Sequence, residues 1–156
     1  MSQCILFVDG ENFLHKIREV FKTEGVDKAN VDLAKIDINK LLSEPLKGFK
    51  IRRKIFYVSR IHLHSETKKK SEELIKFQRS LRNSLVTQGF EFVIAGNVRA
   101  QKVGSLIVFK EKGVDVKIEV DLVSLQLRKL SNAQFYAVLT PIFSQQLQSF
   151  VIAKLK

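Results

Sequence analysis

The chain has little cysteine, proline or tryptophan: its 156 residues include one Cys, two Pro and no Trp. A single Cys cannot form an internal disulfide, which is typical of a reducing compartment, so we expect a cytoplasmic protein. No apolar run approaches the roughly 20 residues that a membrane-spanning helix needs, so no membrane partner is expected. The N-terminus lacks a basic region followed by a cleavage-site pattern, and no secretion signal is predicted.

Acidic residues are also scarce relative to basic ones. The chain has 16 Asp and Glu against 27 Lys and Arg, a net charge of +11 at neutral pH. Such an excess favours polyanions through phosphate contacts and counterion release, although it can also serve solubility alone. Apolar residues make up 45% of the chain, and its length suits one domain over residues 1–156 with its own core.

Several familiar catalytic and binding motifs are missing. There is no GxGxxG or Walker A loop, which excludes the usual dinucleotide and P-loop readings, and no GxSxG nucleophile elbow. His15, His62 and His64 have no Cys partners at zinc spacing and are expected at the surface or in packing roles. Cys4 lies inside an apolar run and is expected in the core.

Strand-like and helix-like segments alternate along the chain. Apolar runs predict strands at about 3–9, 51–58, 90–95 and 135–139. Helical spacing predicts helices at about 12–23, in a short segment before Pro45, from an N-cap at Ser71 to Gly89, and briefly at the end of the chain. This order predicts an α/β fold with a mainly parallel central sheet flanked by helices on both faces.

The stretch from Val114 to Leu122 is ambiguous because apolar and polar residues alternate strictly in it, as in a strand. A helical stripe runs through the same stretch and outlasts the alternation: Val116, Val120, Val123, Leu127 and Leu130. A stripe of about fifteen residues is too long for a typical strand, so we expect a helix with an i,i+4 pair between Lys117 and Asp121.

The first strand offers the clearest candidate for chemistry. The apolar run Cys4–Val8 stops at Asp9 and Gly10, which places a carboxylate at the carboxyl edge of the sheet, where open α/β folds bind ligands. A carboxylate there suits a hard cation such as Mg²⁺ or Mn²⁺. Asn12 follows closely and is expected to cap the first helix, or to orient Asp9 or a phosphate.

One carboxylate cannot hold a catalytic metal, so partners are needed. Asp115 follows Gly113 at the predicted helix start, where it could equally be an ordinary N-cap. Asp121 lies six residues on and could reach the same cleft, or be a solvated partner of Lys117. If the acids converge, a bound cation would offset their repulsion, activate water and stabilise charge on a phosphate.

A basic stretch is the candidate contact for a polyanion. It begins with Lys68, Lys69 and Lys70 and continues along a predicted helix with Arg79 and Arg82 exposed. These residues are expected to guide RNA, although charge runs are more often simply solvated faces.

Two motifs resemble the NYN domain, a branch of the PIN-like nuclease superfamily. They are Val8-Asp9-Gly10-Glu11-Asn12 and Lys112-Gly113-Val114-Asp115-Val116, the latter followed by Asp121. The resemblance covers about residues 3–140. It implies a three-layer PIN-like fold and a ribonuclease dependent on Mg²⁺ or Mn²⁺ that cleaves RNA, expected to be single-stranded. By match to the motifs, Asp9 and Asp115 would bind the metal, Asp9, Asp115 and Asp121 would be catalytic, and Asn12 would lie beside them.

The chain departs from the family pattern after its last strand. Relatives carry an acidic loop there, whereas this chain has Ser144–Leu147 and no acid after Asp121. Relatives also tend to continue further, so the carboxyl-terminal part is expected to be incomplete relative to the family. Three hypotheses stay open: a metal-dependent ribonuclease, an RNA-binding or regulatory module that lost the chemistry, and a protein-interaction domain.

Overall fold

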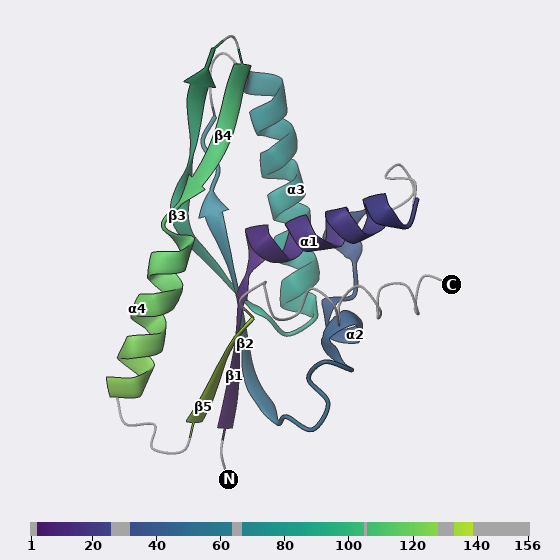
Figure 1. Cartoon of the computed structure of the whole chain (residues 1–156), viewed down its shortest axis with the longest axis vertical. Coiled ribbons are helices and arrows are strands. Elements are labelled where there is room, and N and C mark those ends of the chain that lie inside the picture. Colours follow the sequence, from purple (N-terminus) through teal and green to yellow (C-terminus); the bar gives the residue numbers. More distant parts are fainter. Residues whose placement is uncertain (1–2, 26–31, 64–66, 105, 128–132, 139–156) are drawn as a thin grey trace.

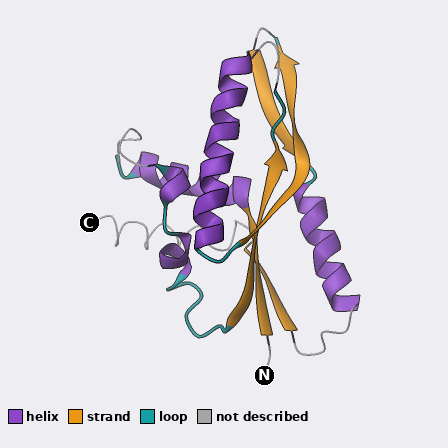
Figure 2. Ribbon diagram, turned by 180° about the vertical axis from the view of Figure 1, so that it is seen from behind, coloured by secondary structure: helices purple, strands orange, loops and turns teal. Residues whose placement is uncertain are grey.

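The computed structural model describes five segments of the chain: residues 3–25, 32–63, 67–104, 106–127 and 133–138. They form an α/β structure in which a central sheet lies between helices (Figures 1 and 2). None of the helices in these segments is both long and apolar enough to cross a membrane. The predicted closing helix and the segment Ser144–Leu147 fall outside the described residues.

The sheet has the strand order β4-β3-β2-β1-β5. Its strands are β1 (Gln3–Asp9), β2 (Ile51–Arg60), β3 (Glu91–Val103), β4 (Leu106–Lys112) and β5 (Ala133–Val138). β1 pairs in parallel with β2 and β5, β2 pairs in parallel with β3, and β4 runs antiparallel to β3. The mainly parallel sheet is therefore confirmed. β1 has a neighbour on each side and is buried on both faces, which explains its unbroken apolar run.

One face of the sheet is covered by three α-helices and a 3₁₀ helix: α1 (Gly10–Thr23), η2 (Leu33–Lys35), α2 (Ile38–Leu42) and α3 (Lys68–Thr87). Phe13 and Ile17 of α1 and Leu85 of α3 join Val8 and Phe56 of the strands in one buried cluster. We call it the first cluster. α1 ends as predicted, with Glu24 as the C-cap and Gly25 following it at a φ of +65°.

The start of α3 differs from the prediction. The sequence pattern places the N-cap at Ser71, but Thr67 holds that position and the helix begins at Lys68. Lysine is a good helix former, so nothing in Lys68–Lys70 stops the helix from extending towards its N-terminus. Ser71 is instead fully buried within α3. The basic segment therefore forms the first helical turn.

The segment 96–113, which follows the third predicted strand, forms most of a β-hairpin. β3 runs on from the predicted strand to Val103, and β4 returns beside it from Leu106 to Lys112. β4 therefore ends beside Asn97, which also pairs with Arg60 at the end of β2. The hairpin returns the chain to the carboxyl edge of β2.

The opposite face of the sheet is covered by α4 (Val114–Leu127), which confirms the helix expected there. Its buried side is not the predicted one. Val114 and Ile118 are buried against Ile5, Phe7 and Tyr57 in what we call the second cluster, and Leu122 and Leu125 are partly buried against it.

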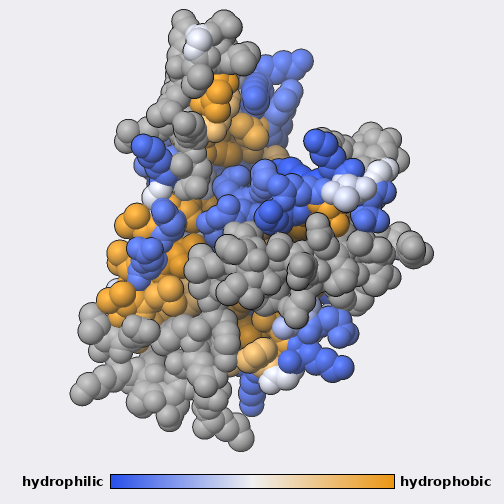
Figure 3. Space-filling model, in the orientation of Figure 1, coloured by the Kyte–Doolittle hydropathy of each residue, from blue (hydrophilic) through white to orange (hydrophobic). Residues whose placement is uncertain are grey.

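The predicted stripe on α4 faces outward instead. Val116, Val120 and Val123 are 57%, 52% and 52% exposed, and Figure 3 shows a hydrophobic surface over α4. α4 carries apolar residues on both sides, because the strand-like alternation supplies a second stripe. Spacing alone could not decide between the two.

Candidate active site

Asp9 is the last residue of β1 and the N-cap of α1. It is only 7% exposed. Its carboxylate is held by Asn12, whose backbone N–H donates to Oδ1 at 3.1 Å and whose side-chain Nδ2 donates to Oδ2 at 2.8 Å. Asn12 thus orients Asp9, one of the roles expected for it. Because side chains alternate along a strand, Asp9 falls on the same face of β1 as Ile5 and Phe7, the face that α4 covers.

Gly10 lets α1 begin directly against β2. A Cβ at this position would lie 2.3 Å from Cε1 of Phe56 and 2.6 Å from the carbonyl oxygen of Tyr57. The backbone oxygen cannot move away without disturbing the paired strand. Only glycine therefore allows the turn that leaves Asp9 at the sheet edge.

The start of α4 lies at the same edge of the sheet. β4 ends at Lys112, which pairs with Asn97 in the interior of β3. Asn97 also pairs with Arg60 at the carboxyl end of β2, and α4 begins after Gly113. A Cβ on Gly96 would lie 2.3 Å from the carbonyl oxygen of Lys112, so the two chain segments are in direct contact there. Gly96 and Gly113 both have positive φ angles, +69° and +98°.

Asp115 occupies the first turn of α4 and is exposed. The preceding residue, Val114, is fully buried against Phe7 and Tyr57, next to the end of β1. Asp9 and the first turn of α4 therefore share one edge and one face of the sheet. Two acids that are 106 positions apart in the sequence come to the same side of the molecule.

Asp121 lies further along α4 than Asp115, away from the helix start. It lies six residues after Asp115, about 9 Å further along the helix axis at about 1.5 Å per residue. The hydroxyl of Tyr57 donates to its Oδ2 at 2.9 Å, and Lys117 forms the predicted i,i+4 ion pair with Oδ1. Burial, together with the hydrogen bond to the Asp121 carboxylate, raises the pKa of Tyr57 well above its ordinary value. Asp121 thus ties α4 to the sheet.

Within the described residues, no group of three or more His, Cys, Asp or Glu side chains could hold a metal ion. Two carboxylates are still compatible with Mg²⁺, which protein sites often bind through one or two carboxylates, with water and substrate phosphate as the other ligands. A carboxylate has about four lone-pair positions, so the two bonds from Asn12 leave Asp9 able to accept a cation.

Sequence reasoning missed Ser59 at the same edge, because it ended the second strand at Val58. Ser59 is buried beyond Tyr57, the residue that pairs with Asp9. Its backbone carbonyl accepts from Gln78 at 2.8 Å, but its hydroxyl has no hydrogen-bond partner among the described residues. The next residue, Arg60, is exposed and brings a positive charge to the end of β2. The signal that could have found Ser59 is the continuation of the strand pattern beyond Val58, since β2 runs on to Arg60.

The predicted RNA-contacting residues do not form one stripe. Lys68, Lys69 and Lys70 are exposed on the first turn of α3, and Arg79 and Arg82 are exposed further along. At about 100° per residue, Arg79 and Arg82 lie within about 40° of Lys68 round the helix, but about 180° and 120° from Lys70. Lys68, Arg79 and Arg82 therefore share one side of α3, and Lys70 lies on another.

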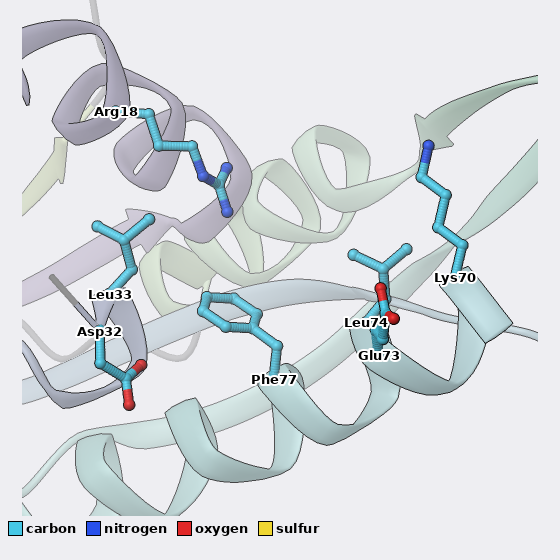
Figure 4. A pocket seen from close by; sticks show the side chains of 7 residues that line it. All are labelled: Arg18, Asp32, Leu33, Lys70, Glu73, Leu74 and Phe77. Carbon is cyan, nitrogen blue, oxygen red and sulfur yellow. The ribbon is translucent and has the colours of Figure 1, made fainter. Parts of the chain in front are cut away.

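Two adjoining hollows lie beside the start of α3. One has a volume of about 430 Å³ and is lined by residues of α1, η2 and α3, including Arg18, Lys70 and Phe77 (Figure 4). The other, of about 520 Å³, is lined by Thr67 and by Lys68–Lys70. Lys70 and Glu73 line both, so the two hollows adjoin along α3, and we call them together the groove.

The histidines and the cysteine agree with their expected structural roles where the structure describes them. His15 is exposed and lies beside Glu19. His62 is also exposed, and its Nε2 lies 3.0 Å from Oδ1 of Asn97. Cys4 is buried in β1. His64 lies outside the described residues.

Comparison of the chain with family models, curated proteins and solved structures gave no match.

Proposed function

We propose that the chain is a ribonuclease of the NYN type, within the PIN-like superfamily, that cleaves single-stranded RNA with Mg²⁺ or Mn²⁺. The observation that carries this proposal is the placement of Asp9 and the first turn of α4 at one edge and on one face of a parallel sheet. Ligands of open α/β sheets bind at this edge. The net charge of +11 favours a polyanionic substrate.

Asp9 and Asp115 are the residues that would hold the metal, with the RNA phosphate and water as its remaining ligands. When bound, the metal supplies charge stabilisation on the phosphate and lowers the pKa of a water molecule. Asn12 holds the Asp9 carboxylate in position through two hydrogen bonds. We place Asp121 third: it acts through the position of α4, since Tyr57 and Lys117 already engage both of its oxygens.

The test is cleavage of labelled single-stranded RNA with and without Mg²⁺ or Mn²⁺. Asp9→Asn and Asp115→Asn should each remove metal-dependent cleavage, because each deletes a proposed metal ligand. Asn12→Ala should reduce it about 10- to 100-fold, the usual effect of losing a residue that orients a ligand. Glu119→Gln is the matched control, since Glu119 is an exposed acid one turn after Asp115. Cleavage that persists in Asp9→Asn would contradict the proposal.

A second candidate function is an RNA-binding module without nuclease activity. It is supported by the absence of a three-acid group among the described residues and of any acid after Asp121 in the sequence. In the same assay this module would bind RNA, lose affinity steeply with salt, and release no product at any metal concentration.

A further inference from the structure

The groove beside α3 differs in character from one end to the other. At one end lie the exposed residues Lys68, Lys69 and Lys70, and the ammonium of Lys70 lies 5.2 Å from the centre of the Phe109 ring. At the other end Leu33, Leu74 and Phe77 form an apolar floor. Such a combination suits a ligand that has an anionic part and a flat apolar part.

The apolar end carries a planar cation. The guanidinium of Arg18, which extends from α1, lies 5.9 Å from the centre of the Phe77 ring. In Figure 4, Arg18 approaches Phe77, while Lys70 stands at the far end beyond Leu74. Arg18 is an exposed residue, so solvent reaches its side chain. RNA-binding proteins stack unpaired bases on aromatic rings and on Arg planes of this kind.

Glu73 offers a hydrogen-bond acceptor between the two ends. It is exposed, lines both hollows, and forms no ion pair with any described residue. Asp32, the other acid in the groove, is already engaged by Lys35 and by the backbone N–H of Ala34. A carboxylate acceptor selects bases that carry an exocyclic amino group, as a carboxylate does with cytosine in DNA.

We propose that this groove binds one nucleotide of single-stranded RNA. The base lies against Arg18 and Phe77, its exocyclic amino group donates to Glu73, and the adjoining phosphates contact Lys68–Lys70. The groove therefore prefers adenine or cytosine to uracil, which has no amino group. This inference rests on the proposed action on RNA and assigns a place to the strand. Arg18 is nine residues after Asp9, about 13.5 Å further along α1 at about 1.5 Å per residue.

Binding can be measured apart from cleavage. The probes are fluorescein-labelled oligomers of adenylate, cytidylate or uridylate, and the readout is fluorescence anisotropy in the presence of EDTA. The unmodified chain should bind the adenylate and cytidylate oligomers more tightly than the uridylate oligomer. Glu73→Ala should abolish that preference, and Glu72→Ala, at the neighbouring exposed acid, should preserve it.

Two further variants separate stacking from charge. Arg18→Ala should weaken binding about tenfold, within the range for loss of a base-stacking contact. Arg79→Ala removes the same charge outside the groove and should weaken binding less. Phe77→Leu keeps an apolar side chain packed against the first cluster and should weaken binding as Arg18→Ala does. The melting temperature of the Phe77→Leu variant should stay near that of the unmodified chain. If it falls, the Arg18 and Glu73 variants alone test whether the groove binds a base.

Two results would overturn the inference. One is equal losses for Arg18→Ala and Arg79→Ala together with no base preference, which would show a response to net charge alone. The other is the absence of binding to any of the three oligomers. If cleavage still depends on Asp9 in the first case, the proposed nuclease stands and only the groove assignment fails.

Discussion

Three α-helices and a 3₁₀ helix cover one face of the sheet, whereas among the described residues α4 alone covers the other. α1 has a single apolar side, which is buried, and its outer surface is hydrophilic in Figure 3. α4 is apolar on two sides, and only one of them is buried. The difference shows that an apolar stripe identifies a helix but identifies its buried side only when the helix has one such stripe.

The largest expected effects come from truncating one aliphatic side chain in each cluster. Leu85→Ala, in the first cluster, should lower the free energy of unfolding by about 3–5 kcal/mol, and Ile118→Ala, in the second, by about 2–3 kcal/mol. Both side chains are buried, but the single helix over Ile118 can settle into the space more easily. Urea titrations monitored by circular dichroism give both values. If Ile118→Ala lowered the free energy of unfolding more than Leu85→Ala does, the prediction that truncation costs more in the first cluster would be wrong.

An intermediate effect is expected at the polar link between α4 and the sheet. Tyr57→Phe removes the hydrogen bond to Asp121 and should lower the free energy of unfolding by about 1 kcal/mol at neutral pH. Unfolding at matched urea concentrations measures the change. Asp121 keeps its ion pair with Lys117, which limits the loss.

The same link predicts a pH dependence. Burial and the hydrogen bond to the Asp121 carboxylate raise the pKa of Tyr57 above its ordinary value of 10.0, so the neutral phenol is favoured in the folded state. The contribution of Tyr57 to the free energy of unfolding is complete when the pH is below its pKa in the unfolded state. This contribution is lost as the pH rises towards its pKa in the folded state. The unmodified chain should therefore lose more stability than Tyr57→Phe above about pH 10. Parallel losses in the two proteins would contradict the raised pKa.

The smallest effect is expected on the outer side of α4. Val120→Ala should change the free energy of unfolding by no more than about 0.5 kcal/mol, because Val120 is exposed and alanine favours a helix. Urea titration measures the change. A loss comparable with that of Ile118→Ala would mean that this side is covered in solution, and the dependence of stability on protein concentration would then show whether a second copy covers it.

Much of the candidate site could be predicted from short stretches of sequence. The run Cys4–Val8 is buried on both sides and ends at an acid and a glycine, so local pattern is enough to place Asp9 at the end of a strand and Asn12 behind it. The helix containing Asp115 and the pair between Lys117 and Asp121 also follow from spacing alone. These features depend on neighbours within about one helical turn.

Other features depend on contacts between distant segments. The hydrogen bond from Tyr57 to Asp121 spans 64 positions, and the buried hydroxyl of Ser59 becomes visible only once β2 is seen to continue. The groove that contains Arg18 and Phe77 forms where α1 crosses α3, and neither Arg79 nor Arg82 lines it. The sequence predicted a basic helix but not which of its charges share a surface.

Local alternation and spacing were therefore sufficient for most of the helices and strands and for the mainly parallel sheet, because backbone geometry converts a short pattern directly into an element. They did not predict the hairpin of β3 and β4. Packing selected the side of α4 that is buried, the partner of Asp121 and the edge shared by Asp9 and the start of α4. These outcomes depend on how the side chains of elements far apart in the chain pack against one another. A pattern within one element does not contain that information.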